Sequence, residues 1–110
     1  MKPKPPLESE IQHAIIQYLE LRKFIVVKVN NTGVYVKARD TYIPPRQKGI
    51  PDLLCMAPGG RYLAVEVKRP GQHPSDDQRA FLERVEAKGG LALVAYSLDD
   101  VIKFLKEQGV

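Results

Sequence analysis

Apolar residues recur at helical and strand spacings along most of the chain, and their pattern predicts a mixed α/β fold. The first apolar stripe has helical spacing and consists of Ile11, Ala14, Ile15, Tyr18 and Leu19. It predicts a helix from about Glu10 to Leu21. Ser9 and Gln12 have the spacing of a capping box, so we expect Ser9 to be the N-cap of this helix. The β-branched and aromatic run at residues 24–29 predicts the first strand.

The segment from residue 30 to residue 50 has a weaker pattern. Turn-forming residues at 30–33 precede a short second strand at residues 34–36, which could pair with the first strand. Residues 37–50 contain two prolines and many charged side chains. We interpret them as a mobile basic loop that lies over a binding face.

Two further strands are predicted at residues 52–57 and 61–68, and the turn at residues 58–60 makes them a hairpin. A second helix is expected to open at Ser75, which has the capping-box spacing to Gln78. Two glycines end this helix.

The last part of the chain completes the fold. The nearly unbroken apolar run at residues 91–96 is typical of a strand buried on both faces. A final helix with a clear apolar stripe ends near Gly109. The predicted order is α-β-β-β-β-α-β-α, in which the strands before and after the second helix are parallel. The sequence therefore predicts an α/β fold with a mixed central sheet flanked by helices.

Composition and charge narrow the class of protein. The chain has 110 residues, which suits one domain at residues 8–110 behind a flexible basic arm at residues 1–7. Charged side chains interrupt every apolar stretch, so neither a membrane span nor a secretory signal is expected. The single cysteine, Cys55, excludes an internal disulfide, and a cytoplasmic setting is expected. The net charge of +4 is compatible with nucleic-acid binding.

Two acidic residues and a lysine are expected to meet at one end of the predicted hairpin. Glu66 and Lys68 are two residues apart on one strand, so their side chains share a face. The hairpin returns this end of the strand beside Asp52, which begins the preceding strand. Asp52, Glu66 and Lys68 can therefore converge on one spot.

Such a spot favours a hard divalent cation. Two neighbouring carboxylates repel each other, and Mg²⁺ prefers carboxylates, water and phosphate oxygen as ligands. The lysine could position or help deprotonate a water, or stabilise charge on a phosphate. Arg46, Lys48 and Arg69 lie nearby and could contact phosphates. The residues indicate metal-assisted hydrolysis of a phosphodiester.

These motifs resemble those of a known family. Pro51-Asp52 followed by Glu66-Val67-Lys68 resembles the PD-(D/E)XK nuclease signature. The flanking segments are similar to the VRR-NUC branch, the virus-type replication and repair nuclease domain. They are Ser9-Glu10, Lys48-Gly49-Ile50-Pro51-Asp52-Leu53, Ser75-x-x-Gln78, Gly89-Gly90 and Val94-Ala95-Tyr96-Ser97, and the resemblance spans roughly residues 8–107.

The resemblance implies a role for individual residues. Asp52 and Glu66 would bind the catalytic Mg²⁺ or Mn²⁺ together with the Val67 carbonyl. Glu10 would be the helix-borne acid that supports the metal site. Lys68 would be the catalytic lysine, and Gln78 would orient the site.

The resemblance also implies a fold and an activity. The fold would have a restriction-endonuclease-like core, similar to that of Holliday-junction resolvases. The implied protein is a free-standing viral or phage enzyme of DNA repair in the host cytoplasm. It would act as a metal-dependent DNA endonuclease and homodimer on branched DNA, with no membrane partner and no small-molecule cofactor.

Other interpretations stay open at this point. Glu66 and Lys68 could form an exposed ion pair, Gln78 could serve only as a cap, and Glu10 could be a first-turn acid. The three basic residues could be solvated. The enzyme could instead cut ends, flaps or plain duplex. A catalytically silent DNA-binding module and a partner-dependent subunit are the alternatives in function.

Overall fold

The elements follow one another along the chain in the predicted sequence of types, with one additional strand. The computed structural model describes residues 4–29, 33–44 and 47–110. The elements are α1 (Glu8–Leu21), β1 (Ile25–Lys28), β2 (Val34–Val36), the 3₁₀ helix η1 (Lys37–Arg39), β3 (Thr41–Ile43), β4 (Leu53–Met56), β5 (Tyr62–Val67), α2 (Asp76–Ala87), β6 (Leu91–Ala95) and α3 (Leu98–Glu107).

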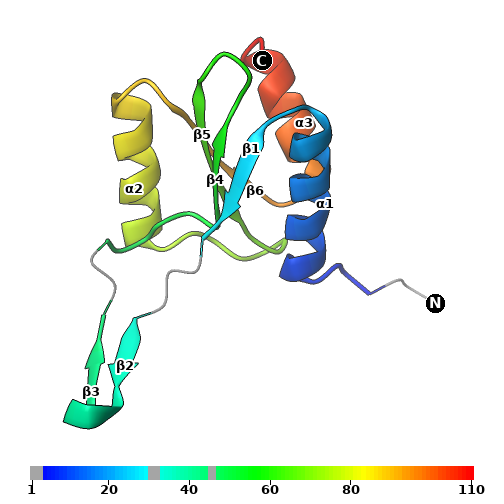
Figure 1. Ribbon diagram of the computed structural model, residues 1–110. Helices are drawn as coiled ribbons and strands as arrows, with labels where there is room; N and C mark the ends of the chain where they lie inside the picture. The colour runs from blue at the N-terminus through cyan, green and yellow to red at the C-terminus, as the bar shows by residue number, and fades with distance from the viewer. Residues whose placement is uncertain (1–3, 30–32, 45–46) are drawn as a thin grey trace.

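A four-stranded mixed sheet forms the centre of the molecule. Its strand order is β1-β4-β5-β6. The β1–β4 and β4–β5 pairs are antiparallel and the β5–β6 pair is parallel, since α2 connects β5 to β6 as a crossover helix. Figure 1 shows α1 and α3 on one face of the sheet and α2 on the other. The predicted fold class, a mixed sheet flanked by helices, is confirmed.

The hydrophobic core lies between the sheet and the helix pair α1 and α3. Alternate residues of β4 and β5 point toward these helices, because successive side chains of a strand face opposite sides. Cys55 is one of them and is buried. The core residues without solvent exposure are Ile15, Leu19, Leu53, Leu63, Val65, Val67, Ala95, Val101 and Leu105.

Helix α1 begins two residues before the predicted position, so Ser9 is not its N-cap. The N-cap position is Leu7, and Ser9 lies inside the first turn. The side chain of Glu10 reaches back and accepts a hydrogen bond from the Leu7 backbone N–H at 3.3 Å. Glu10 thus supplies the reciprocal half of a capping box, while no side chain at the N-cap accepts from the first-turn N–H groups as the predicted serine would.

The possible pairing of residues 34–36 with the first strand is wrong. β2 pairs with β3 in a separate two-stranded antiparallel sheet, with Tyr35 opposite Tyr42. The segment interpreted as a loop at 37–50 therefore contains η1 and β3. Asp40 makes the reversal possible, because its backbone is left-handed (φ 47°), a conformation that Asp tolerates better than most residues.

Burial of the strands also differs from the prediction. β6 is an edge strand whose ends, Leu91 and Ala95, are buried while its middle is half-buried. β5 is instead the strand buried on both faces, from Leu63 to Val67. Helix α2 covers the β5 and β6 side of its face, so apolar residues of β1 and β4 on that face stay exposed. Within the described ranges, no helix has the length and apolar character to cross a membrane.

Candidate active site

Asp52 and Glu66 lie side by side at one end of the central hairpin. The pairing of Leu53 with Val65 places Asp52 across from Glu66, one residue before β4 begins. Oδ2 of Asp52 accepts a hydrogen bond of 2.9 Å from the Val67 backbone N–H. This bond ties the loop before β4 to the end of β5 and fixes the direction of the Asp52 carboxylate.

The Glu66 carboxylate is the most deeply buried charged group of the site. Its residue is only 2% exposed. Oε1 accepts a hydrogen bond from Nε2 of Gln78 at 3.0 Å and lies 3.7 Å from Nζ of Lys68. Oε2 is buried and has no hydrogen-bond partner among the described residues. The interpretation of Glu66 and Lys68 as an exposed surface pair is therefore excluded.

Burial and neighbouring acids raise the pKa of Glu66. Desolvation has the largest effect, followed by the negative charge of Asp52, and the pKa rises to about 8. Lys68 lowers it, while the charge of Glu8 adds to the rise. A carboxyl group in this setting is stabilised either by a proton or by a bound cation.

The donor set fits a hard divalent cation. Asp52 and Glu66 supply two carboxylates, and the unpartnered Oε2 atom is available as a ligand. In the part of the chain that the structure describes, no group of three or more His, Cys, Asp and Glu side chains is gathered closely enough to enclose a metal. Two carboxylates with positions left for water and phosphate are what Mg²⁺ prefers.

Gln78 connects helix α2 to the acidic pair. Its backbone N–H donates to the Ser75 hydroxyl at 3.2 Å, and its side-chain Oε1 accepts from the Ser75 N–H at 2.8 Å. The predicted capping box is thus confirmed. Its Nε2 remains free to donate to Glu66, so the same side chain both caps the helix and orients the carboxylate.

Replacing Gln78 by glutamate separates these two roles. Gln78→Glu keeps the oxygen that accepts from Ser75, but it removes the amide donor to Glu66 and adds a like charge. We expect metal-supported activity to fall about 10- to 100-fold. The charge beside the buried carboxylate should also lower the stability of the metal-free protein. Gln78→Ala loses the cap as well, so its unfolding temperature should also fall. Equal activity of Gln78→Glu and the wild type would leave only the capping role.

The structure does not bring Glu10 to the acidic pair. Glu10 is exposed and its carboxylate accepts from the Leu7 N–H. Glu8 is half-buried and is the helix acid whose charge acts on Glu66. A sequence signal exists for Glu8, since it precedes Gln12 by four residues and extends the buried stripe of α1. The sequence analysis missed it because the helix was expected to begin later.

The segment before Asp52 packs on the start of helix α2. Gly49 has a positive φ of 72°, and a side chain there would meet the Asp77 backbone and, at 2.6 Å, the Gln78 nitrogen. Only glycine lets the segment approach this closely. Asp52 and Gln78, although far apart in sequence, are thereby held in one unit.

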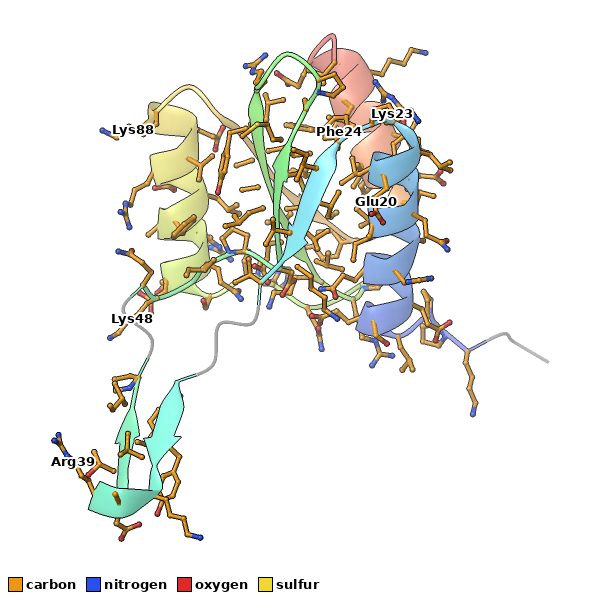
Figure 2. All side chains as sticks on the ribbon, viewed as in Figure 1. Glu20, Lys23, Phe24, Arg39, Lys48 and Lys88 are labelled. Carbon is orange, nitrogen blue, oxygen red and sulfur yellow. The ribbon has the colours of Figure 1, made fainter. Side chains whose placement is uncertain are left out.

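The residues predicted to bind phosphate differ in their exposure to solvent. Arg69 is half-buried and follows Lys68 directly. Lys48 is exposed, where the chain returns toward the base of α2 (Figure 2). Arg46 lies outside the described residues.

Comparisons with known proteins identify the family and the fold. The VRR-NUC domain matches residues 8–99. A phage protein named "Putative nuclease p44", from Acyrthosiphon pisum secondary endosymbiont phage 1, is 34% identical over 85 residues. That match covers 77% of this chain and 88% of the phage protein.

Two solved structures share the fold. One, a VRR-NUC domain, has a TM-score of 0.67 at 26% identity and covers 90% of this chain and 94% of its own. The other, a VRR-NUC domain protein, has a TM-score of 0.66 at 22% identity and covers 94% and 88%.

The family match, the phage relative and the shared fold thus define a nuclease-type α/β domain. The family match extends over most of the chain, from α1 into α3. The chain belongs to the VRR-NUC family.

Proposed function

We propose that this protein is a Mg²⁺- or Mn²⁺-dependent endonuclease that hydrolyses phosphodiester bonds of DNA, with a preference for branched DNA. The observation that carries the proposal is the buried Glu66 carboxylate, which has one unpartnered oxygen beside Asp52 and Lys68. A buried acidic pair is costly unless a cation neutralises it. A DNA-binding module without catalysis has no use for such a pair.

Asp52 and Glu66 would hold the cation, with the Val67 carbonyl as a further ligand. A bound divalent cation supplies Lewis-acid stabilisation of the phosphate charge and activation of water. Lys68 places its ammonium group 3.7 Å from Oε1 of Glu66 and is partly exposed, so it can reach a substrate phosphate or water. In the hydrolysis a water oxygen forms the new bond to phosphorus, and the bond to the leaving sugar oxygen breaks.

Gln78 and Val67 would keep the two carboxylates in place during the reaction. The Gln78 amide holds Oε1 of Glu66, which leaves Oε2 to face the cation. The Val67 N–H holds Oδ2 of Asp52, which leaves Oδ1 available. Such hydrogen bonds to ligand residues fix ligand orientation. Arg69 and Lys48 would contact phosphates that flank the cleaved bond.

Two acids at the start of α1 are candidates for the supporting role at the metal. Glu10 is the position that the family resemblance gives, whereas the charge of Glu8 is the one that acts on Glu66. We expect Glu8→Gln to raise the Mg²⁺ concentration for half-maximal cleavage several-fold. Glu10→Gln should leave it unchanged and lower only the unfolding temperature, through the Leu7 contact. A metal titration of both variants decides between the acids, and a larger shift for Glu10→Gln would restore the first assignment.

The enzyme is proposed to act as a homodimer, because a two-fold junction needs two matched cuts. Exposed apolar side chains support this. Ile25, Val27 and Met56 are 65%, 52% and 47% exposed on the sheet face that α2 leaves uncovered. Contiguous apolar surface of this kind is typical of protein interfaces. A second copy of the chain is the proposed occupant, and light scattering measures the resulting mass.

The proposed function is tested with a labelled panel of DNA substrates. The panel contains a four-way junction, a flap, a fork, a plain duplex and a single strand, each with Mg²⁺, Mn²⁺ or EDTA. Symmetric paired cuts of the junction that EDTA abolishes are the expected result. Metal-dependent cuts confined to flaps or ends would keep the active site and remove the branch preference. Binding without cleavage of any substrate would favour the binding module.

A further inference from the structure

A two-stranded hairpin projects from the body of the protein. It consists of β2, η1 and β3 with their flanking residues, and we refer to residues 33–44 as the protruding hairpin. Figure 1 shows it extending away from the central sheet, below the end of β1 and the start of α2. The radius of gyration is 15.5 Å, compared with about 13 Å for a compact domain of this length. The hairpin therefore makes the molecule longer without adding to its hydrophobic core.

Side-chain hydrogen bonds hold the protruding hairpin in shape. The Tyr35 hydroxyl donates to the Asp40 carboxylate, and the Thr41 hydroxyl donates to the Arg39 carbonyl at 2.8 Å. At the base, the Gly33 N–H donates to the Tyr42 hydroxyl at 2.9 Å. A two-stranded hairpin is marginally stable in water, so these bonds matter for its form. The hairpin therefore has a defined conformation before it binds a partner.

The tip of the protruding hairpin presents cations. Lys37 and Arg39 are both exposed and belong to η1. The one acid of the tip, Asp40, is engaged by Tyr35. Figure 2 shows Arg39 at the far end of the hairpin and Lys48 at its base. Basic side chains thus lie at the tip of the hairpin and beside the start of α2, at the end of the sheet where β4 begins (Figures 1 and 2).

The dimensions of the hairpin match duplex DNA. A two-stranded ribbon fits the major groove of B-DNA. Ala38 lies five positions after Gly33 in the chain. Residues of β2 rise about 3.3 Å each and those of η1 about 2 Å each, so the tip lies roughly 14 Å from the base of the hairpin. With a rise of about 3.4 Å per base pair, this length corresponds to roughly four base pairs.

We propose that the protruding hairpin binds duplex DNA to one side of the cleaved bond, with Lys37 and Arg39 on backbone phosphates. The inference rests on the proposed function, because DNA in the active site is what brings a duplex to the hairpin. It extends the DNA contact beyond Lys48 and Arg69. A substrate must then have a duplex flank of sufficient length for full affinity.

The cations favour DNA over a second copy of the chain as the partner of this hairpin. Lysine is depleted in protein interfaces. The aromatic residues Tyr35 and Tyr42 lie along the strands, and their hydroxyls are occupied by internal hydrogen bonds. If the hairpin bound a second copy of the chain, dimer formation would depend on these two tyrosines and Ile43 and not on the tip cations. The experiment below distinguishes the two.

The test compares a tip variant, Lys37→Ala with Arg39→Ala, with a matched control, Lys103→Ala with Lys106→Ala on α3. Both remove two exposed cations. Binding is measured by fluorescence anisotropy in EDTA on a junction with long duplex arms, and on junctions in which one arm is trimmed to about four base pairs. The salt concentration is varied for each combination of protein and junction. Circular dichroism verifies that both variants fold.

We expect the wild type and the control to bind the long junction about tenfold more tightly than the junction trimmed on the side of the hairpin. The tip variant should bind both equally weakly. Its plot of log affinity against log salt should be shallower by about two, as the loss of two phosphate contacts requires. Retained length dependence, or an equal loss in the control, would overturn the inference.

Two further outcomes separate this inference from the proposed function. If the wild type neither binds nor cuts any DNA, the proposed function itself fails. If the wild type cuts DNA and the tip variant is indistinguishable from it, only the role of the hairpin fails. A change of mass in light scattering for Tyr42→Ser with Ile43→Ser, together with unchanged DNA binding by the tip variant, would assign the hairpin to a second copy of the chain.

Discussion

Replacing Glu66 by glutamine is expected to reduce DNA cleavage by at least about 10²- to 10³-fold while the protein stays folded and binds DNA. Glutamine has the same shape, but it removes the negative charge from the buried position where Oε2 is unpartnered. Loss of one preorganised electrostatic contact typically costs a reaction this much. Lys68→Ala should have an effect of similar size, because it removes the ammonium group beside the same carboxylate.

Initial rates on the labelled junction measure this effect, and anisotropy in EDTA measures binding. Glu107→Gln is the matched control, since it makes the same chemical change at an exposed position near the end of α3. The control should cut at the wild-type rate. Full activity in both Glu66→Gln and Lys68→Ala would show that the chemistry takes place elsewhere on the molecule.

The metal-free protein is expected to become less stable as the pH rises from about 5 to 8. The pKa of Glu66 is about 8 in the folded protein and about 4.5 in its ordinary state. Between these values the folded protein keeps a proton that the unfolded chain releases. The contribution of the raised pKa is therefore fully present below about 4.5 and is lost as the pH passes through 8. Each pH unit in the range corresponds to about 1.4 kcal/mol.

Denaturant unfolding in EDTA at several pH values measures this dependence. The difference in unfolding free energy between the wild type and Glu66→Gln at each pH gives the contribution of the Glu66 carboxyl group alone. Mg²⁺ should restore stability at pH 8, because a cation then occupies the site in place of the proton. Parallel pH curves for the two proteins would show that Glu66 releases its proton at an ordinary pH in the folded state.

The sequence predicts the central sheet and the acidic pair well because each rests on local chemistry. Glu66 and Asp52 meet because a short turn joins two adjacent strands, which fixes which residues face each other. The Ser75 and Gln78 spacing predicts a cap that the structure contains. The contact between Gln78 and Glu66 depends on how α2 packs across the sheet, and residue spacing carries no information on that.

The start of helix α1 shows how a small error in a boundary changes a functional assignment. Glu8 and Glu10 are two residues apart, so on a helix they point about 200° away from each other. A cap at Ser9 gives an acceptable capping box but leaves Glu8 outside the helix. The observed start at Glu8 places that residue in line with Gln12 and Ile15 of the buried stripe.

The predicted strand at residues 34–36 is confirmed as β2, but its partner β3 and the pairing of the two could not be predicted from the apolar pattern. Both strands have three residues, and all three residues of β3 are exposed, so burial does not select their residue types. Their pairing depends on the left-handed Asp40 and on hydrogen bonds of Tyr35 and Tyr42. These are side-chain contacts of exposed residues, which leave little trace in hydrophobic periodicity.

The buried position of Cys55 makes this protein convenient for site-specific labelling. Cys55 is the only cysteine, and burial raises the pKa of its thiol to about 12. Its thiolate is therefore scarce and shielded in the folded protein, whereas the thiolate is the form that alkylating reagents attack. A cysteine introduced at the hairpin tip can carry a fluorophore without prior removal of Cys55. Slow modification of Cys55 itself then reports how often the core opens.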